Sequence, residues 1–104
     1  AMKSIEKTLA GPSASDYFSA AQYFYQTNGD MTKALSWVNS AISNSPKGQD
    51  VPFWYLRLKS LIQAKSGDKK GAIATANESL ALSIKAGNGD YEKMNKDSIA
   101  EWSK

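Results

Sequence analysis

The stretch Gly29-Asp30-Met31-Thr32-Lys33-Ala34-Leu35 recurs later in the chain as Gly67-Asp68-Lys69-Lys70-Gly71-Ala72-Ile73. The two copies lie 38 residues apart, and each is followed by a similar pattern of small and apolar residues. A self-similar period of roughly 20–50 residues is the signature of stacked supersecondary units that share one continuous core. The sequence therefore predicts a helical-repeat protein before any functional motif is considered.

The length and composition favour one folded domain. The chain has 104 residues, of which 41% are hydrophobic and 11% aromatic, as is typical of globular proteins. No apolar run approaches the roughly 20 residues that span a bilayer, so we expect no membrane insertion. The first residues contain neither the apolar stretch nor the cleavage site of a signal peptide.

Glycines, prolines and capping residues divide the chain into helix-length segments, and no strand-like alternation competes with them. We expect a short helix or linker remnant at 1–12, repeats at 13–48 and 49–88, and a C-terminal capping helix at 89–104. The predicted fold is all-α: an α-solenoid fragment of two helical hairpins, closed by the amphipathic last helix. Its Trp102 is expected to be buried against the second hairpin.

Capping residues mark the expected helix starts. Ser13 or Ser15 suits the N-cap of the first helix of the first hairpin, and Asp30 suits the N-cap of the helix that follows. Asp50 is expected to cap the third helix with Pro52 in the first turn, where proline is tolerated.

The second helix of each hairpin carries the pattern of a tetratricopeptide repeat: a small residue, an apolar residue four positions later, another small residue three beyond, and a Pro at the end, which is Pro46 in the first copy and is lacking in the second. These positions hold Ala34, Val38 and Ala41 in the first copy, and Ala72, Ala76 and Ser79 in the second. Over about residues 15–87 the chain thus resembles tetratricopeptide-repeat proteins. The resemblance implies close helix crossings at the small residues, and a groove for peptides or partner helices along the first helices of the hairpins.

The first helices of the hairpins fit this pattern less directly. In the first copy, a turn with one extra residue aligns Tyr17, Ala20, Ala21 and Phe24 with the pattern, and we prefer this to the unshifted register, which places Gln22 at the small-residue site. Two registers stay open in the second copy. One buries Trp54, Leu58, Leu61 and Ile62, and the other places Ser60 at the small site with Lys59 inside.

A narrower resemblance rests on residues 53–60 (FWYLRLKS) running into 67–70 (GDKK), on 98–102 (SIAEW) and on 9–13 (LAGPS). These stretches are similar to the C-terminal helical region of an uncharacterised bacterial family, whose members are usually exported and carry a β-rich domain of unknown function ahead of the helices. The resemblance implies a periplasmic or exported location, and makes that preceding domain a candidate partner. Without the resemblance we expect a cytoplasmic protein.

The residue types present argue against several function classes. The chain has no His and no Cys, so Ser-His and Cys-His nucleophiles are impossible and a zinc site would need carboxylates alone. Two Ser-x-x-Lys strings lack the further motifs of serine acyl-transferases. The formal charge of +3 comes from scattered lysines and a single Arg, which does not favour nucleic-acid binding. We expect no enzyme activity, no cofactor or metal, and no nucleic-acid partner.

Aromatic residues supply the best binding candidates. Those between 17 and 25 encircle their helix, and residues 53–55 are three consecutive aromatics, so some must face outward. The groove candidates are Phe18, Gln22, Tyr25, Tyr55 and Lys59, with Arg57 under one of the open registers. Their alternative role is packing. The acidic-tail clamp of chaperone-binding repeats does not carry over, because either Phe18 and Gln22 or Ser19 and Tyr23 stand where it needs Lys and Asn.

The expected function is a non-enzymatic protein–protein interaction module that binds a peptide, a partner protein or a neighbouring domain. The alternative is a structural or dimerisation domain of a larger exported bacterial protein whose activity lies elsewhere.

Overall fold

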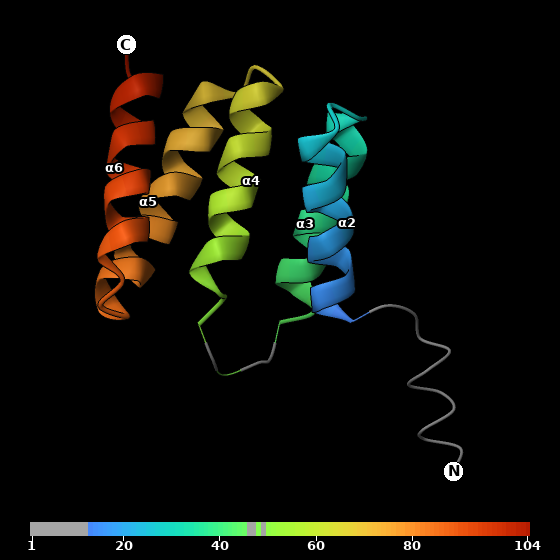
Figure 1. Ribbon diagram of the computed structural model, residues 1–104, viewed down its shortest axis with the longest axis horizontal. Helices are drawn as coiled ribbons and strands as arrows, with labels where there is room; N and C mark the ends of the chain where they lie inside the picture. Colours follow the sequence, from blue (N-terminus) through green and yellow to red (C-terminus); the bar gives the residue numbers. More distant parts are fainter. Residues whose placement is uncertain (1–12, 46–47, 49) are drawn as a thin grey trace.

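The computed structural model describes residues 13–45, 48 and 50–104, and all regular structure within them is α-helical (Figure 1). This confirms the predicted all-α fold. The element expected at 1–12 lies outside the described residues. The helices are α2 (Ala14–Gln26), α3 (Met31–Ser43), α4 (Phe53–Lys65), α5 (Lys69–Lys85) and α6 (Gly89–Trp102).

Each helix packs mainly against its neighbours in sequence, and α4 also contacts α2 and α6 directly. Figure 1 shows the axes standing side by side, with α2 and α3 forming one hairpin, α4 and α5 a second, and α6 closing the row. Packing confined to near neighbours is what a helical-repeat fold requires. Three helices, α2, α4 and α6, therefore occupy equivalent places in the row.

Side-chain caps fix most of the helix starts. Ser13 forms a capping box with Asp16: the Asp16 amide donates to Ser13 Oγ at 3.3 Å, and the Ser13 amide donates to Asp16 Oδ2 at 3.1 Å. Asp30 accepts from two amides of α3, and Asp68 accepts from the Gly71 amide at 2.9 Å. Asn88 caps α6 by accepting from the Tyr91 amide at 3.0 Å.

The expected Asp50 cap is wrong. α4 begins at Phe53, with Pro52 as its N-cap residue. The cause is the proline ring, which disfavours helical backbone at the preceding Val51 and so prevents the helix from starting earlier. The Asp50 carboxylate instead pairs with Lys85 Nζ at 2.6 Å.

The two hairpin turns differ by one residue. Between α2 and α3 the chain passes through Thr27, Asn28, Gly29 and Asp30, whereas residues 66–68 suffice between α4 and α5. The left-handed residue is Asn28 (φ 57°) in the first turn and Gly67 (φ 96°) in the second. Gly29 and Gly67, which align in sequence, therefore have different backbone roles.

The extra residue in the first turn explains the register of α2. Ala21 is fully buried and Gln22 is exposed, which confirms the preferred shift. In the second hairpin neither register is met in full. Leu58 and Ile62 are buried as one register requires, although Trp54 is 42% exposed, and Ser60 is fully buried as the other register requires. Lys59, which that register would place inside, is only partly buried.

Small residues lie at the helix crossings, as predicted. Those predicted in α3 and α5 all have an exposed fraction of zero: Ala34, Ala41, Ala72 and Ser79. Ala21, Ala34 and Val38 form one buried cluster with Leu58 and Ile62 of α4, which joins the two hairpins. Because small residues let backbones approach closely, the larger apolar groups beside them fill the remaining space.

The last two helices are packed in a more polar way than the sequence suggested. On α5, Ile84 is 51% exposed, whereas Ser79 and Ser83 are fully buried. On α6, Asn95 is fully buried, while Trp102 is only partly buried rather than buried as expected. The reason is that α5 packs against both α4 and α6, and its serine-bearing side fits between them.

Candidate functional site

Three equivalent helices border a hollow of about 140 Å³, which we call the inter-helix hollow. α2 contributes two lining residues, α4 contributes four and α6 contributes two. Among the described residues no acidic side chain lines it, and Arg57 is the one cation. The lining consists of Phe18, Gln22, Trp54, Arg57, Leu58, Leu61, Tyr91 and Met94.

Arg57 extends from α4 toward α6. Its Nη1 donates to Asn95 Oδ1 at 3.2 Å and to Ser98 Oγ at 3.1 Å. Burial lowers the pKa of Arg57 below its ordinary value, while the charges of Tyr91 and Tyr25 act in the opposite direction. The guanidinium still carries its charge at neutral pH, because arginine stays protonated in proteins far above that pH.

The positive charge of Arg57 has no carboxylate partner in the described part of the chain, since none of the ion pairs found there involves it. A guanidinium has five N–H donors, and the two bonds above use only Nη1. No buried side-chain nitrogen or oxygen lacks a hydrogen-bond partner among the described residues. The Nε and Nη2 donors have no hydrogen-bond partner in the described part of the chain.

A chain of buried hydrogen bonds holds Asn95, the residue that accepts from Arg57. Asn95 Nδ2 donates to Ser79 Oγ at 2.9 Å, and the Ser79 hydroxyl donates to the Phe53 carbonyl at 2.8 Å. The chain links α4, α5 and α6, and it fixes which side of the Asn95 amide faces Arg57. The guanidinium is thus oriented by α6 rather than left free to rotate.

Aromatic and apolar groups line the same hollow as Arg57. Phe18 stacks on Tyr55 with ring centroids 4.7 Å apart, and the rings of Phe53 and Tyr91 meet edge to face at 4.9 Å. At the rim, Trp54 is 42% exposed and Met94 is 37% exposed. The hollow therefore offers apolar contact area around one cation.

The six predicted groove residues do not all meet in one place. Phe18, Gln22 and Arg57 line the inter-helix hollow. Tyr55 is buried behind Phe18, Tyr25 lies under Lys65 with Nζ 5.1 Å from the ring centroid, and Lys59 is partly buried outside the lining.

Sequence reasoning did not select the other five lining residues, which are Trp54, Leu58, Leu61, Tyr91 and Met94. The three consecutive aromatics at 53–55 were a usable signal for Trp54, because helical geometry turns adjacent residues about 100° apart. Tyr91 and Met94 belong to the last helix, for which the sequence predicted a capping role and no binding surface.

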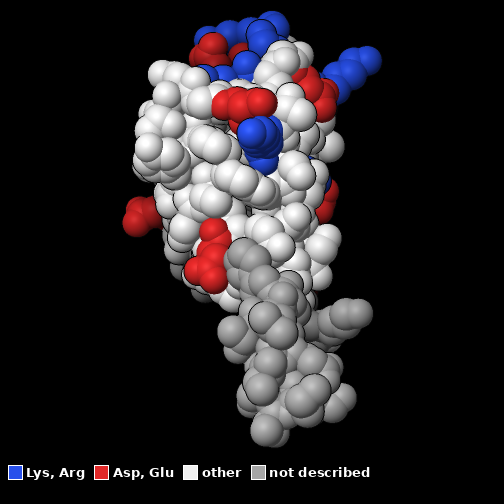
Figure 2. All heavy atoms as spheres, turned by 90° about the vertical axis from the view of Figure 1, so that its right-hand side faces the viewer, with Lys and Arg blue, Asp and Glu red and all other residues white. Residues whose placement is uncertain are grey.

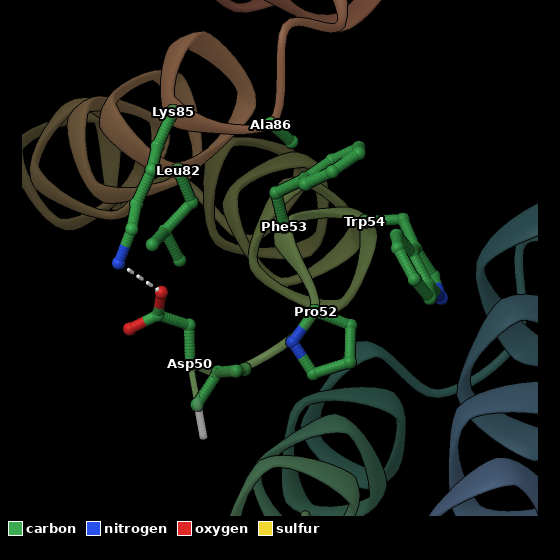
Figure 3. Close-up of a pocket in the computed structure, with 8 residues that line it drawn as sticks. Asp50, Pro52, Phe53, Trp54, Leu82, Lys85 and Ala86 are labelled. Atoms are coloured by element: carbon green, nitrogen blue, oxygen red, sulfur yellow. Dashed lines mark hydrogen bonds and ion pairs between the residues drawn. The ribbon is translucent and has the colours of Figure 1, made fainter.

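A larger hollow, of about 450 Å³, lies between the segment before α4 and the C-terminal turn of α5 (Figure 3). The Lys85–Asp50 ion pair closes one side, and Trp54, which borders both hollows, points away from that pair. We assign no ligand to this second hollow.

Other chemistry has little support in the described residues. They contain no group of three His, Cys, Asp or Glu side chains placed to hold a metal ion. No described helix has both the length and the apolar character needed to cross a membrane. Asp97 and Glu101 lie on the exposed face of α6, where they pair with Lys93 and Lys104.

Comparisons with protein-family models, with curated proteins and with solved structures gave no significant match.

Proposed function

We propose that this chain is a non-enzymatic protein-interaction module, and that it holds a peptide or an extended segment of a partner protein in the inter-helix hollow. The observation that carries the proposal is that all three equivalent helices contribute side chains to one hollow. Its rim leaves large apolar groups in water, notably Trp54, which is 42% exposed. Exposed tryptophan and arginine are the residue types enriched at binding hot spots.

The resemblance to tetratricopeptide repeats belongs to the same proposal. It is supported by the fully buried small residues at the helix crossings, Ala34, Ala41, Ala72 and Ser79. The resemblance to an exported bacterial family with a β-rich domain is likewise a proposal. It would make that domain one source of the bound segment.

The proposal is tested with short random-sequence peptides, each displayed as an internal segment of a carrier protein. The peptides are selected for binding to the full chain. We expect enriched peptides whose affinity falls at least about tenfold when Trp54 is replaced by Ala, because hot-spot aromatics dominate binding energy. Tyr23→Ala is the matched control, since Tyr23 is an exposed aromatic of α2 outside the lining. Absence of enrichment, or equal loss with both variants, refutes the proposal.

A second candidate is self-association through the first hairpin. Helices α2 and α3 together carry only one acid, Asp16, and one base, Lys33. This hairpin forms one end of the molecule, and Figure 2, which views that end, shows few charged side chains across its middle. Tyr23, 63% exposed, adds apolar surface.

Sedimentation equilibrium of the chain separates the two candidates. A dimer that Tyr23→Asp dissociates and Trp54→Asp leaves intact supports self-association through the first hairpin. A monomer at all concentrations excludes that candidate and leaves the inter-helix hollow as the binding surface.

A further inference from the structure

We propose that the inter-helix hollow selects an acidic side chain of its partner, a Glu or Asp next to an aromatic or aliphatic residue, with the carboxylate bound by Arg57 Nε and Nη2. This inference rests on the proposed function and adds the chemistry of the bound segment to it. Its basis is the juxtaposition of one oriented, carboxylate-free guanidinium with the exposed apolar groups of Trp54 and Met94.

The size of the hollow decides the kind of occupant. Sites for drug-sized molecules and cofactors enclose roughly 300–1,000 Å³. The inter-helix hollow has about 140 Å³, which suits one projecting side chain rather than a whole small molecule. A polypeptide supplies such a side chain, and its neighbouring residues can lie on the apolar rim.

The charge of the hollow decides the side chain. Arg57 is a partly buried cation that pairs with no carboxylate of the described residues, and only its Nη1 has regained hydrogen bonds from protein groups in place of lost hydration. A carboxylate supplies both the missing counter-ion and hydrogen-bond acceptors, because guanidinium and carboxylate form two parallel, charge-assisted hydrogen bonds. The free donors, Nε and Nη2, lie on adjacent corners of the guanidinium and match this fork. The formal net charge of +3 adds a long-range attraction for acidic partners.

The same features disfavour other anions. Phosphate groups are usually bound by clusters of arginines, whereas this lining has one. Nucleic acids need a basic stripe that follows a backbone, and no Lys of the described ranges lines the hollow. The single cation is matched by the single charge of one Glu or Asp.

The experiment uses the selected internal peptides and the full chain. We expect the enriched sequences to share a Glu or Asp beside an aromatic or aliphatic residue. Replacing that acid by its amide in the peptide should raise the dissociation constant by about tenfold or more, because charge-assisted bonds are lost. This change leaves the protein untouched, so it cannot be confused with misfolding.

Two variants of the chain complete the test. The Arg57→Gln variant should bind the acidic peptide more weakly by a similar factor. It should bind the amide peptide nearly as well as the unaltered chain does. Lys59→Gln is the matched control: it removes one positive charge from the same helix, outside the lining, and should change affinity by less than about twofold.

The outcomes separate the two proposals. If no internal peptide is enriched, or affinity does not depend on Trp54, the proposed function fails. If peptides bind through Trp54 but carry no acid, tolerate the amide, or need a free C-terminal carboxylate, the acidic-side-chain inference alone is wrong. Stronger binding of single-stranded oligonucleotides than of the peptides also overturns it.

Discussion

Asn95 of α6 donates from Nδ2 to the hydroxyl oxygen of Ser79 in α5 at 2.9 Å, and both side chains are completely buried. Through Arg57 on one side and the Phe53 carbonyl on the other, this bond joins α6 to the second hairpin. A buried polar group that loses its partner lowers the free energy of unfolding. This series of hydrogen bonds therefore ties the position of α6 to one side-chain arrangement. The last helix is therefore held by a polar contact where an apolar one was expected.

Replacing Asn95 by Ala should lower the free energy of unfolding by about 2 kcal/mol, because Ser79 and Arg57 each lose a partner. Urea denaturation followed by circular dichroism measures the change. Asn77→Ala is the control: Asn77 is exposed on α5 and bonds only to the Ile73 carbonyl of its own helix. Equal midpoints for the two variants would show that the polar chain does not stabilise α6.

Enlarging a small residue at a helix crossing should destabilise the protein. Ala72 is fully buried, so Ala72→Leu should cost about 1–3 kcal/mol by overpacking. Ala74, two residues along α5, is exposed, and Ala74→Leu should leave the free energy of unfolding nearly unchanged, since both residues are good helix formers. Thermal unfolding of the pair gives the comparison. If both substitutions are tolerated, the two helices do not approach closely at Ala72.

Gly71 should resist a substitution that normally stabilises helices. Gly→Ala in a helix gains about 1 kcal/mol, but a Cβ at Gly71 would press on the carboxylate of Asp68, whose Oδ1 caps the Gly71 amide. Loss of that cap costs about 1 kcal/mol, so Gly71→Ala should be neutral or destabilising.

The combination with Asp68→Ala tests the cause. In the Asp68→Ala background the cap is already gone, and Gly71→Ala should then raise the free energy of unfolding by up to about 1 kcal/mol. Chemical denaturation of the four proteins in this cycle gives the coupling energy. A coupling of zero would mean that the glycine and the cap are independent.

The Lys85–Asp50 ion pair should contribute little. Its side chains are 71% and 54% exposed, and exposed pairs are typically worth less than about 1 kcal/mol. Lys85→Ala should therefore shift the thermal midpoint only slightly, and high salt should remove the difference. A large loss that persists in high salt would show that the stem of Lys85, and not its charge, supports the larger hollow.

The sequence by itself determined the architecture. The copies at Gly29 and Gly67, the small residues at Ala34 and Ala72, and the absence of strand-like alternation predicted helical hairpins, because these are local signals. The extra residue in the first turn could also be inferred, since it was needed to bring Ala21 into the small-residue site. Of the candidate site, Phe18, Gln22 and Arg57 were selected in advance.

The tertiary structure alone decided the rest. Whether Trp54 or Ser60 faces inward depends on how α4 rotates against α3 and α5, and both registers gave a plausible apolar side in the sequence. That Asn95 and Ser98 meet Arg57 from about 40 residues away is a contact between helices, which no local pattern encodes. Periodicity predicts which residues share a side of a helix, but only packing determines what that side faces.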